Sequence, residues 1–407
     1  MRNADQIINA RWIITCEDNN FLLENYALVL NNGFIVNMLP QSKAYELYRA
    51  NSEQNFSHHA LMPGFINSHT HAAMNLFRGL ADDLELMDWL NNYIWPREKA
   101  WVSEHMVYDG SLLAIAEMIR CGTTCFNDMY FFPNATARAA EQAGLRAHLG
   151  IAVADFSSSW AHDPDEYIAK GLLFYEEYKN NSLIHVSMAP HSTYMLSEEY
   201  LIKTHEIASQ YNLKTNIHLQ EAPGEISLSL KKYNQRPLEK LFKLNLINKN
   251  LIAIHMTQIS QRDLEILQQT QPNIIHCPES NMKLVSGACP VQILQEHNIN
   301  VALGTDGAAS NNDLDMFGEM RSAAFLGKLT ANNPKALNVK DILKMATING
   351  AKALGQDHIT GSLKINKSAD FIAINLEQIE TQPLFNPLSQ IVYACTREQV
   401  SDVWVRG

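Results

Sequence analysis

The chain has 407 residues, with 32 Lys and Arg against 43 Asp and Glu, and therefore a formal charge of −11. This acidic balance argues against nucleic acid or an anionic membrane as the main partner, because binding phosphate groups requires an excess of basic side chains. A hydrophobic content of 46% excludes a disordered chain. The six cysteines form no Cys-x-x-Cys pair, and neither a signal-peptide pattern nor a membrane-spanning apolar run is found, so we expect a cytoplasmic protein with reduced thiols.

The two ends of the chain share a residue composition that is typical of β-strands. Both contain runs of β-branched and aromatic residues, and Asn31-Asn32-Gly33 lies where a tight hairpin turn is expected. Segments with this strand-like composition are 10–18, 25–39, 361–376, 390–396 and 402–407. We therefore expect one small β-sandwich-like domain assembled from residues 1–60 and 359–407.

Between these ends, over residues 61–358, short apolar runs alternate with helical patterns. Eight runs end in polar residues, and they read LMPGFINSHTH, TTCFNDM, LRAHLGIAV, LIHVSMAPHS, LKTNIHLQE, LIAIHM, NIIHCPES and NVALGTDG. Strand–helix alternation predicts parallel βαβ units, and eight of them fit an α/β fold of the (β/α)8 barrel type, which needs about 250 residues. A doubly wound open sheet is the alternative, but no Gly-x-Gly-x-x-Gly follows the first strand to support dinucleotide binding.

Histidines and carboxylates gather at the ends of these runs. In a (β/α)8 barrel the carboxyl ends of the strands form the catalytic face, so these side chains are expected to surround one site. The residues at the run ends are His69, His71, His191, His218, Glu221, His255 and Asp306.

His69-Thr70-His71 is the first element of a candidate metal site. Side chains at positions i and i+2 of a strand point to the same face, so both imidazoles can reach one ion. Two strand histidines alone would more often be structural. With His218 and Asp306 they make three nitrogens and one oxygen, which suits zinc or iron(II), whereas calcium or magnesium would require more oxygen ligands.

Two further residues are candidates for proton chemistry. Glu221 lies three residues after His218 and is placed to act as a general acid/base beside the metal, although a glutamate there could also be a solvated loop residue. His255 has two readings of equal weight from its position alone. It is either a buried strand histidine or the group that orients the attacking hydroxide.

Six segments together resemble the amidohydrolase superfamily, and more narrowly its branch of methylthioadenosine/S-adenosylhomocysteine deaminases and related triazine hydrolases. The segments are LMPGFINSHTHAAMNLFRGLADDLELMDWL, HLQEAPGEI, IAIHMTQIS, HCPESNMKL, GTDGAASNNDLDMF and GSLKINKSADFIAI. The resemblance covers nearly the whole chain and implies a metal-dependent hydrolase barrel. The fourth run lacks the lysine found in binuclear members, which favours a single zinc ion per chain, with iron(II) as the other possibility.

The resemblance also assigns roles to individual residues. It implies metal ligands at His69, His71, His218 and Asp306. It implies Glu221 as proton shuttle, His255 as the water-orienting group, and Asp306 as a base as well as a ligand. It implies substrate contacts at Trp89, Glu98, His191 and Ser310, with Glu98 accepting hydrogen bonds from the ribose hydroxyls.

The implied reaction is hydrolytic deamination of a 6-aminopurine nucleoside, namely 5′-methylthioadenosine, S-adenosylhomocysteine or adenosine. The third run offers only Arg146 to hold an amino-acid carboxylate, which favours methylthioadenosine or adenosine. The family's His-Ser-Pro-Tyr reads His-Ser-Thr-Tyr here, with Thr193 in place of proline.

Alternative functions are a guanine or cytosine deaminase, a chlorotriazine-type hydrolase on the same barrel and, more remotely, a metal-free structural relative. We expect a small-molecule partner, no nucleic acid or membrane partner and, from the resemblance, a homo-oligomer.

Overall fold

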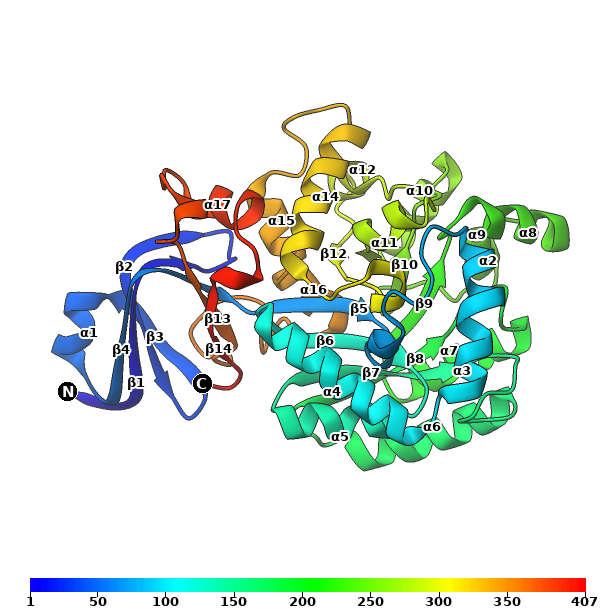
Figure 1. Cartoon of the computed structure of the whole chain (residues 1–407), viewed down its shortest axis with the longest axis horizontal. Coiled ribbons are helices and arrows are strands. Elements are labelled where there is room, and N and C mark those ends of the chain that lie inside the picture. The colour runs from blue at the N-terminus through cyan, green and yellow to red at the C-terminus, as the bar shows by residue number, and fades with distance from the viewer.

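The computed structural model describes residues 1–407, which form two separate β-sheets. An eight-stranded parallel sheet has the order β12-β11-β10-β9-β8-β7-β6-β5. A six-stranded sheet has the order β14-β13-β4-β1-β2-β3. The smaller sheet lies beside the barrel and holds both termini (Figure 1). The fold therefore contains the predicted barrel and a small β-domain built from the two ends of the chain.

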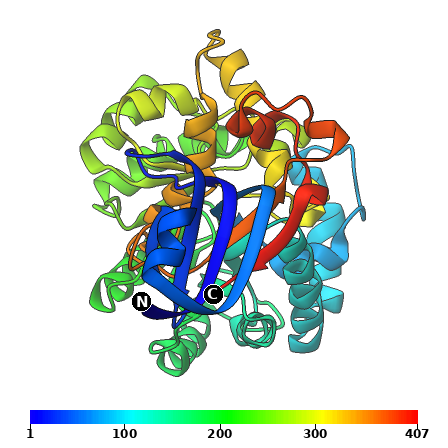
Figure 2. The same cartoon turned by 90° about the vertical axis from the view of Figure 1, so that its left-hand side faces the viewer.

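The six-stranded sheet joins the first and last strands of the chain, as Figure 2 shows. The predicted hairpin turn is confirmed, because Asn31 pairs with Phe34 while Asn32 and Gly33 have φ angles of 51° and 79°. Positive φ at both central residues is what a type I′ turn requires. β13 pairs antiparallel with β4, so the C-terminal strands extend the N-terminal sheet. The strands are β1 (Arg2–Ile14), β2 (Leu22–Asn31), β3 (Phe34–Pro40), β4 (Tyr48–Pro63), β13 (Phe371–Asn375) and β14 (Val400–Trp404).

One predicted strand is wrong. The segment 390–396 lies mostly in helix α17 (Pro387–Tyr393). The Asn386 side chain accepts hydrogen bonds from the backbone N–H groups of the first turn, and Pro387 at the first position favours a helix start. The buried residues of this helix follow helical spacing and not strand alternation. A further short helix, α1 (Gln41–Leu47), interrupts the strands of the first sixty residues.

Each of the eight predicted apolar runs contains a barrel strand. The barrel closes between β5 and β12, where the Asn67 amide donates to the Thr305 hydroxyl at 2.7 Å and accepts from its backbone N–H at 3.0 Å. Gly304 permits this approach, because a Cβ there would lie 2.7 Å from the backbone nitrogen of His69. The strands are β5 (Phe65–Thr70), β6 (Thr123–Tyr130), β7 (Arg146–Val153), β8 (Ile184–Pro190), β9 (Thr215–Leu219), β10 (Leu251–His255), β11 (Asn273–His276) and β12 (Val301–Leu303).

Helices surround the barrel and cover the catalytic end of its strands (Figure 1). The helical patterns expected between the apolar runs include those that form α4 (Glu104–Arg120), α7 (Glu198–Gln210) and α10 (Gln261–Thr270). No helix has both the length and the apolar composition needed to cross a membrane. The other helices are η1 (Ala72–Phe77), α2 (Leu86–Asp88), η2 (Trp89–Ile94), α3 (Trp95–Trp101), α5 (Pro133–Ala143), α6 (Pro164–Tyr178), α8 (Pro223–Tyr233), α9 (Pro237–Lys243), α11 (Pro278–Lys283), α12 (Val291–Glu296), α13 (Ala308–Asn311), α14 (Met316–Thr330), α15 (Val339–Met345), α16 (Ile348–Leu354), η3 (Ile379–Thr381) and η4 (Arg397–Gln399).

A buried ion pair ties the barrel to the smaller sheet. Arg146, at the start of β7, donates to Asp370 at 2.6 Å, and the two side chains are only 5% and 0% exposed. Its guanidinium also donates to the Ser368 hydroxyl at 2.8 Å. Arg146 therefore lies at the amino end of its strand, opposite the catalytic face, and its donors are already used.

Candidate functional site

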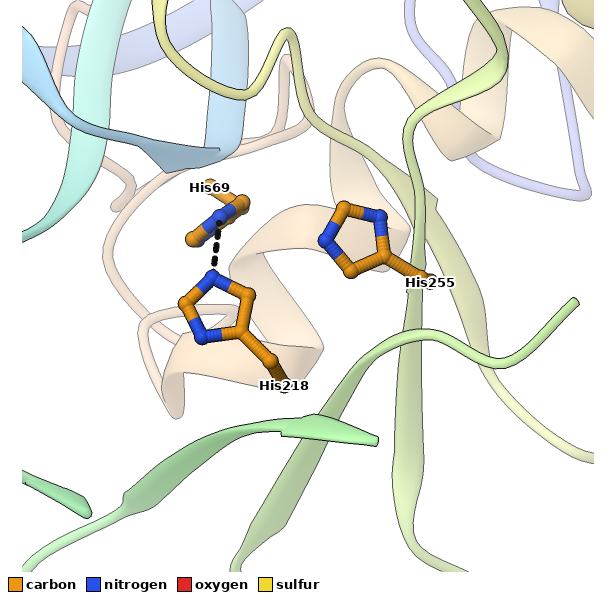
Figure 3. Close-up of side chains that lie close together, drawn as sticks. All are labelled: His69, His218 and His255. Carbon is orange, nitrogen blue, oxygen red and sulfur yellow. Dashed lines mark hydrogen bonds between the residues drawn. The ribbon is translucent and has the colours of Figure 1, made fainter. Parts of the chain in front are cut away.

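Five predicted residues come together at the carboxyl ends of four barrel strands. His69 belongs to β5 and His71 follows it, His218 belongs to β9, His255 ends β10, and Asp306 lies three residues after β12. All are buried except His71, whose side chain is 15% exposed. Figure 3 shows the imidazoles of His69, His218 and His255 facing a common centre from different strands.

The four predicted metal ligands lie in two neighbouring groups that share His69, one with His71 and Asp306 and one with His218 and His255. Nε2 of His69 and Nε2 of His71 each lie 3.4 Å from Oδ1 of Asp306. Nε2 of His218 lies 3.2 Å from Nε2 of His69, the contact dashed in Figure 3. The ligand atoms of His69, His71 and Asp306 all lie within 4.8 Å of one another.

Hydrogen bonds behind the imidazoles show why this cluster fits a cation. Nδ1 of His71 lies 2.6 Å from the Met129 carbonyl oxygen, and Nδ1 of His218 lies 3.0 Å from that of His191. Each Nδ1–H therefore donates to a carbonyl, which leaves the lone pair of Nε2 facing the cluster. Burial lowers the pKa of His69 to about 4 and holds that of His218 well below its usual value, so both are neutral. The Nε2 lone pairs of His71 and His218 and the Asp306 carboxylate are therefore a donor set that suits a cation.

Hydroxyl groups hold the other oxygen of the Asp306 carboxylate. Ser280 donates to Oδ2 at 2.7 Å, and the Ser310 hydroxyl lies 3.1 Å from the same atom. The Gly307 backbone N–H donates to Oδ1 at 2.8 Å. Asp306 itself has a φ of 61°, a conformation that non-glycine residues seldom adopt and that is often found at functional sites. The carboxylate is therefore fixed with Oδ1 toward the histidines.

Glu221 follows β9 by two residues and points into the same site. Its side chain is 12% exposed, and Oε1 lies 3.8 Å from Nε2 of His255. Burial and the nearby charge of Asp306 raise the pKa of Glu221 to about 8, so it carries a proton at neutral pH. Glu225 fixes the backbone here, because its Oε2 accepts the Glu221 N–H at 2.9 Å. Glu221 is thus a buried carboxyl group with a raised pKa beside the cluster.

His255 differs from the other imidazoles in its hydrogen bonding. The Asn281 side-chain amide donates to Nδ1 of His255 at 3.1 Å, which places the ring proton on Nε2, toward Glu221. Burial lowers the pKa of His255, so the ring is neutral. The residue has a φ of 75°, which turns its side chain off the end of β10. His255 is therefore a hydrogen-bond donor in this arrangement, whereas His71 and His218 present lone pairs.

A cavity lined by 27 residues, 18 of them hydrophobic, lies over the cluster. Mostly apolar walls with a few polar groups are typical of small-molecule sites. All four predicted substrate contacts line it, namely Trp89, Glu98, His191 and Ser310.

The four predicted substrate contacts differ in their burial and in the hydrogen bonds that they already make. Glu98 accepts a hydrogen bond from the Tyr130 hydroxyl at 2.7 Å, and burial raises its pKa. The ring of His191 packs 4.7 Å from that of His218, and its buried Nδ1 has no partner. Trp89 is 7% exposed and forms part of the wall. Ser310 lines the cavity, but its hydroxyl already donates a hydrogen bond to the Asp306 carboxylate.

Sequence reasoning missed several supporting residues. Ser280 and Asn281 stand in the HCPESN segment directly after β11, and that position was their one visible signal. Glu225 likewise stands in the HLQEAPGEI segment, whereas Tyr130 at the end of β6 gave no comparable signal. Thr193, which replaces the family's proline, donates to Oε1 of Glu225 at 3.5 Å and so links the loop after β8 to the start of α8.

The sequence matches known proteins along its whole length. The Amidohydrolase family model matches residues 60–407. A 5-methylthioadenosine/S-adenosylhomocysteine deaminase from Saccharophagus degradans is 45% identical over 404 residues, covering 99% of this chain and 91% of the relative. A 5′-deoxyadenosine deaminase from Methanosphaera stadtmanae is 43% identical over 346 residues, covering 85% of this chain and 81% of the relative.

The structure also matches solved structures. An adenosine deaminase from Xanthomonas campestris with bound zinc superposes with a TM-score of 0.98 at 42% identity, covering 100% of this chain and 92% of the other. An atrazine chlorohydrolase from Arthrobacter aurescens complexed with zinc gives a TM-score of 0.92 at 20% identity, covering 99% of this chain and 94% of the other. At that identity the second likeness shows the barrel fold alone.

Proposed function

Because the chain belongs to the amidohydrolase family, we propose that it is a metal-dependent hydrolase that deaminates a 6-aminopurine nucleoside. The reaction replaces the 6-amino group with oxygen and releases ammonia. The observation that carries the proposal is the buried carboxyl group of Glu221, which lies 3.8 Å from Nε2 of His255 and lines the same cavity as three further histidines and Asp306. The three relatives that are 42–45% identical support it, because each is named as a deaminase of adenosine or of a 5′ derivative of adenosine.

The proposed cofactor is one zinc ion per chain, held by His69, His71, His218 and Asp306. Three imidazoles and a carboxylate match the ligands that zinc prefers, and iron(II) accepts the same set. When bound, such an ion lowers the pKa of water toward about 7 and so supplies hydroxide at neutral pH. Metal analysis of the purified protein distinguishes zinc from iron. A content far below one ion per chain, with no gain on reconstitution, would favour the metal-free structural relative.

The residues of the chain supply the proton transfers. Glu221 donates its proton to N1 of the purine, which lets the ring accept electrons as water attacks C6. Asp306 accepts the proton that the attacking water loses. Nε2–H of His255 donates a hydrogen bond to the oxygen that attacks. Asp306 then passes its proton to the exocyclic nitrogen, which leaves as ammonia, and the C6 hydroxyl returns its own proton to Glu221 as the carbonyl of the inosine-type product forms.

Glu98 and Trp89 are the proposed contacts for the rest of the nucleoside. The Glu98 carboxylate can accept hydrogen bonds from two vicinal ribose hydroxyls, and Tyr130 fixes its orientation through the 2.7 Å hydrogen bond. A free base or a triazine offers no hydroxyls to this group. Glu98 therefore separates the nucleoside proposal from a guanine or cytosine deaminase and from a chlorotriazine-type hydrolase.

The proposal is tested by ammonia release from a panel of aminopurine nucleosides, free bases and triazines with zinc-loaded protein. We expect adenosine-type nucleosides to be the substrates. Glu98→Ala should raise KM for nucleosides while leaving any turnover of free bases unchanged. Turnover of free bases or triazines, with none of the nucleosides, would refute the proposed function.

A further inference from the structure

A second cavity lies at the amino end of the barrel, opposite the histidine cluster. It is lined by 15 residues, which come from the amino ends of β7 and β8, the segment before β9, the last turn of α6 and the end of α16. No aspartate or glutamate lines it. Its basic side chains are His148, Lys179, His185 and Lys214. The lining is therefore basic, although the chain as a whole carries a net charge of −11.

Lys214 is a cation without a counter-ion. Its ammonium donates to the side-chain oxygen of Asn250 at 3.2 Å, which is a neutral acceptor. It forms no ion pair, and Asp357 acts on it only from a greater distance. Burial lowers the pKa of Lys214, because its charge lies partly out of water, where an unpaired charge is unfavourable. Lys179, in contrast, is paired with Glu176 at 2.5 Å.

Two stacked imidazoles stand beside this lysine. His148 of β7 and His185 of β8 are register partners, with ring centroids 6.1 Å apart and 21° between the ring planes. Burial lowers the pKa of His148 to about 3 and that of His185 to about 4, so both rings are neutral and each has one N–H donor.

Three of the lining side chains contain a buried polar atom that has no hydrogen-bond partner in the protein. These atoms are Nδ1 of His148, Nε2 of His185 and Oε1 of Gln356. Buried polar atoms are nearly always hydrogen-bonded, so three unpaired ones around a single cavity indicate a partner from outside the chain.

Tyrosines form another part of the lining. Tyr175 and Tyr178 belong to the last turn of α6, and Tyr211 follows α7. The rings of Tyr175 and Tyr211 lie 4.9 Å apart between centroids. These rings give a planar or apolar group a surface to pack on, close to the lysine and the two imidazoles.

We propose that this amino-end cavity is an anion site that binds a phosphate group, as the free ion or as a small monoester, with Lys214 as the counter-ion and His148 and His185 as hydrogen-bond donors. Lysine is a common point-charge ligand of phosphate. The lack of carboxylates in the lining removes the like-charge repulsion that would oppose an anion. The site lies at the other end of the strands from the histidine cluster, so the proposal does not rest on the deaminase reaction.

Calorimetric titration of the purified protein with inorganic phosphate and with phenyl phosphate tests the site. We expect binding, and we expect Lys214→Met to weaken it by about tenfold or more, because a charge-assisted hydrogen bond is lost. Lys335→Met removes an exposed lysine outside the cavity and should leave the affinity unchanged. Tighter binding of phenyl phosphate than of phosphate would identify a monoester that packs on the tyrosines, and equal binding would identify the free ion.

A second variant and a second measurement support the first. His185→Phe keeps a ring beside His148 but removes its N–H groups, and it should weaken phosphate binding by about three- to tenfold. Phosphate should also raise the Tm of the wild-type protein and of the Lys335→Met variant, but not that of the Lys214→Met variant, because only a folded protein with an intact site gains from the ligand.

Two results would overturn the proposal. Equal phosphate affinity in the wild-type protein and in a folded Lys214→Met variant would place the anion elsewhere, for example at the catalytic face. No binding at millimolar phosphate would show that the residues at this end of the barrel serve stability alone, which is their usual role. Neither result bears on the deaminase proposal.

Discussion

The hydroxyl of Ser280 donates to Oδ2 of Asp306 at 2.7 Å, while Oδ1 of the same carboxylate faces His69 and His71. The two carboxylate oxygens of Asp306 thus make different contacts. One is anchored by a residue from the helix after β11, and the other is presented to the histidine cluster. The orientation of the proposed ligand is therefore fixed by the neighbouring helix α11 and not only by its own backbone.

Removing this anchor should weaken the metal site. Ser280→Ala frees the Asp306 side chain to rotate, and we expect zinc affinity or kcat to fall by about 10- to 100-fold. Zinc affinity is measured by competition with a chelator, which separates this effect from a general loss of stability. Ser227→Ala, which removes an exposed helix hydroxyl on α8, is the control. Unchanged affinity and unchanged kcat in the Ser280 variant would contradict the anchoring role.

Glu221→Gln should separate metal binding from catalysis. The amide keeps the shape of the side chain but cannot deliver a proton to N1, so kcat is expected to fall by roughly 10²- to 10⁴-fold. Zinc content should stay at the wild-type level, because Glu221 is not a proposed ligand. Glu199→Gln, on the exposed face of α7, should have no effect on either quantity. Near-normal turnover by the Glu221 variant would exclude it as the proton donor.

Activity should decline on the alkaline side. The pKa of Glu221 is raised from 4.5 to about 8, so the protonated form that donates to N1 predominates below that pH and is lost above it. A bound cation stabilises the carboxylate and shifts the midpoint to about 8 or below. We expect kcat/KM for methylthioadenosine, measured from pH 6 to 10, to fall through this range. A profile that stays level to pH 10 would rule out a proton held by Glu221.

The buried ion pair between Arg146 and Asp370 should matter strongly for stability. Arg146→Met leaves a fully buried carboxylate without its partner, and we expect a loss of about 3–5 kcal/mol in the free energy of unfolding. The Arg138–Glu104 pair lies on the surface with both side chains about half exposed, so Arg138→Met should cost less than about 1 kcal/mol. Denaturant unfolding measures both. Equal effects of the two substitutions would show that the buried pair has no special role.

The barrel could be predicted because its signals are local. Each strand is a short apolar run, and polar residues such as His218 and Asp306 stand at the run ends, where parallel strands place them at one face. His69 and His71 add the strand period of two. The same local rule failed at 390–396, since a short apolar run fits a strand or a buried helix equally well. In the structure that segment is helical, because the Asn386 cap and Pro387 start α17 just before it.

The supporting contacts could not be predicted because they cross between elements. Ser280 reaches Asp306, and Asn281 reaches His255, only because the helix after β11 starts between the ends of β10 and β12. Nothing in the spacing of these residues specifies which neighbour they meet. The tautomer of His255 follows from such a contact and is likewise invisible in the sequence.

The pairing of β13 with β4 sets an order of events during synthesis on the ribosome. The first four strands emerge early, yet the partner of the β4 edge is not made until the whole barrel has been translated. An unpaired strand edge is open to pairing with other chains. The nascent protein therefore carries an incomplete sheet while its barrel folds, and the last strands to be translated close that edge.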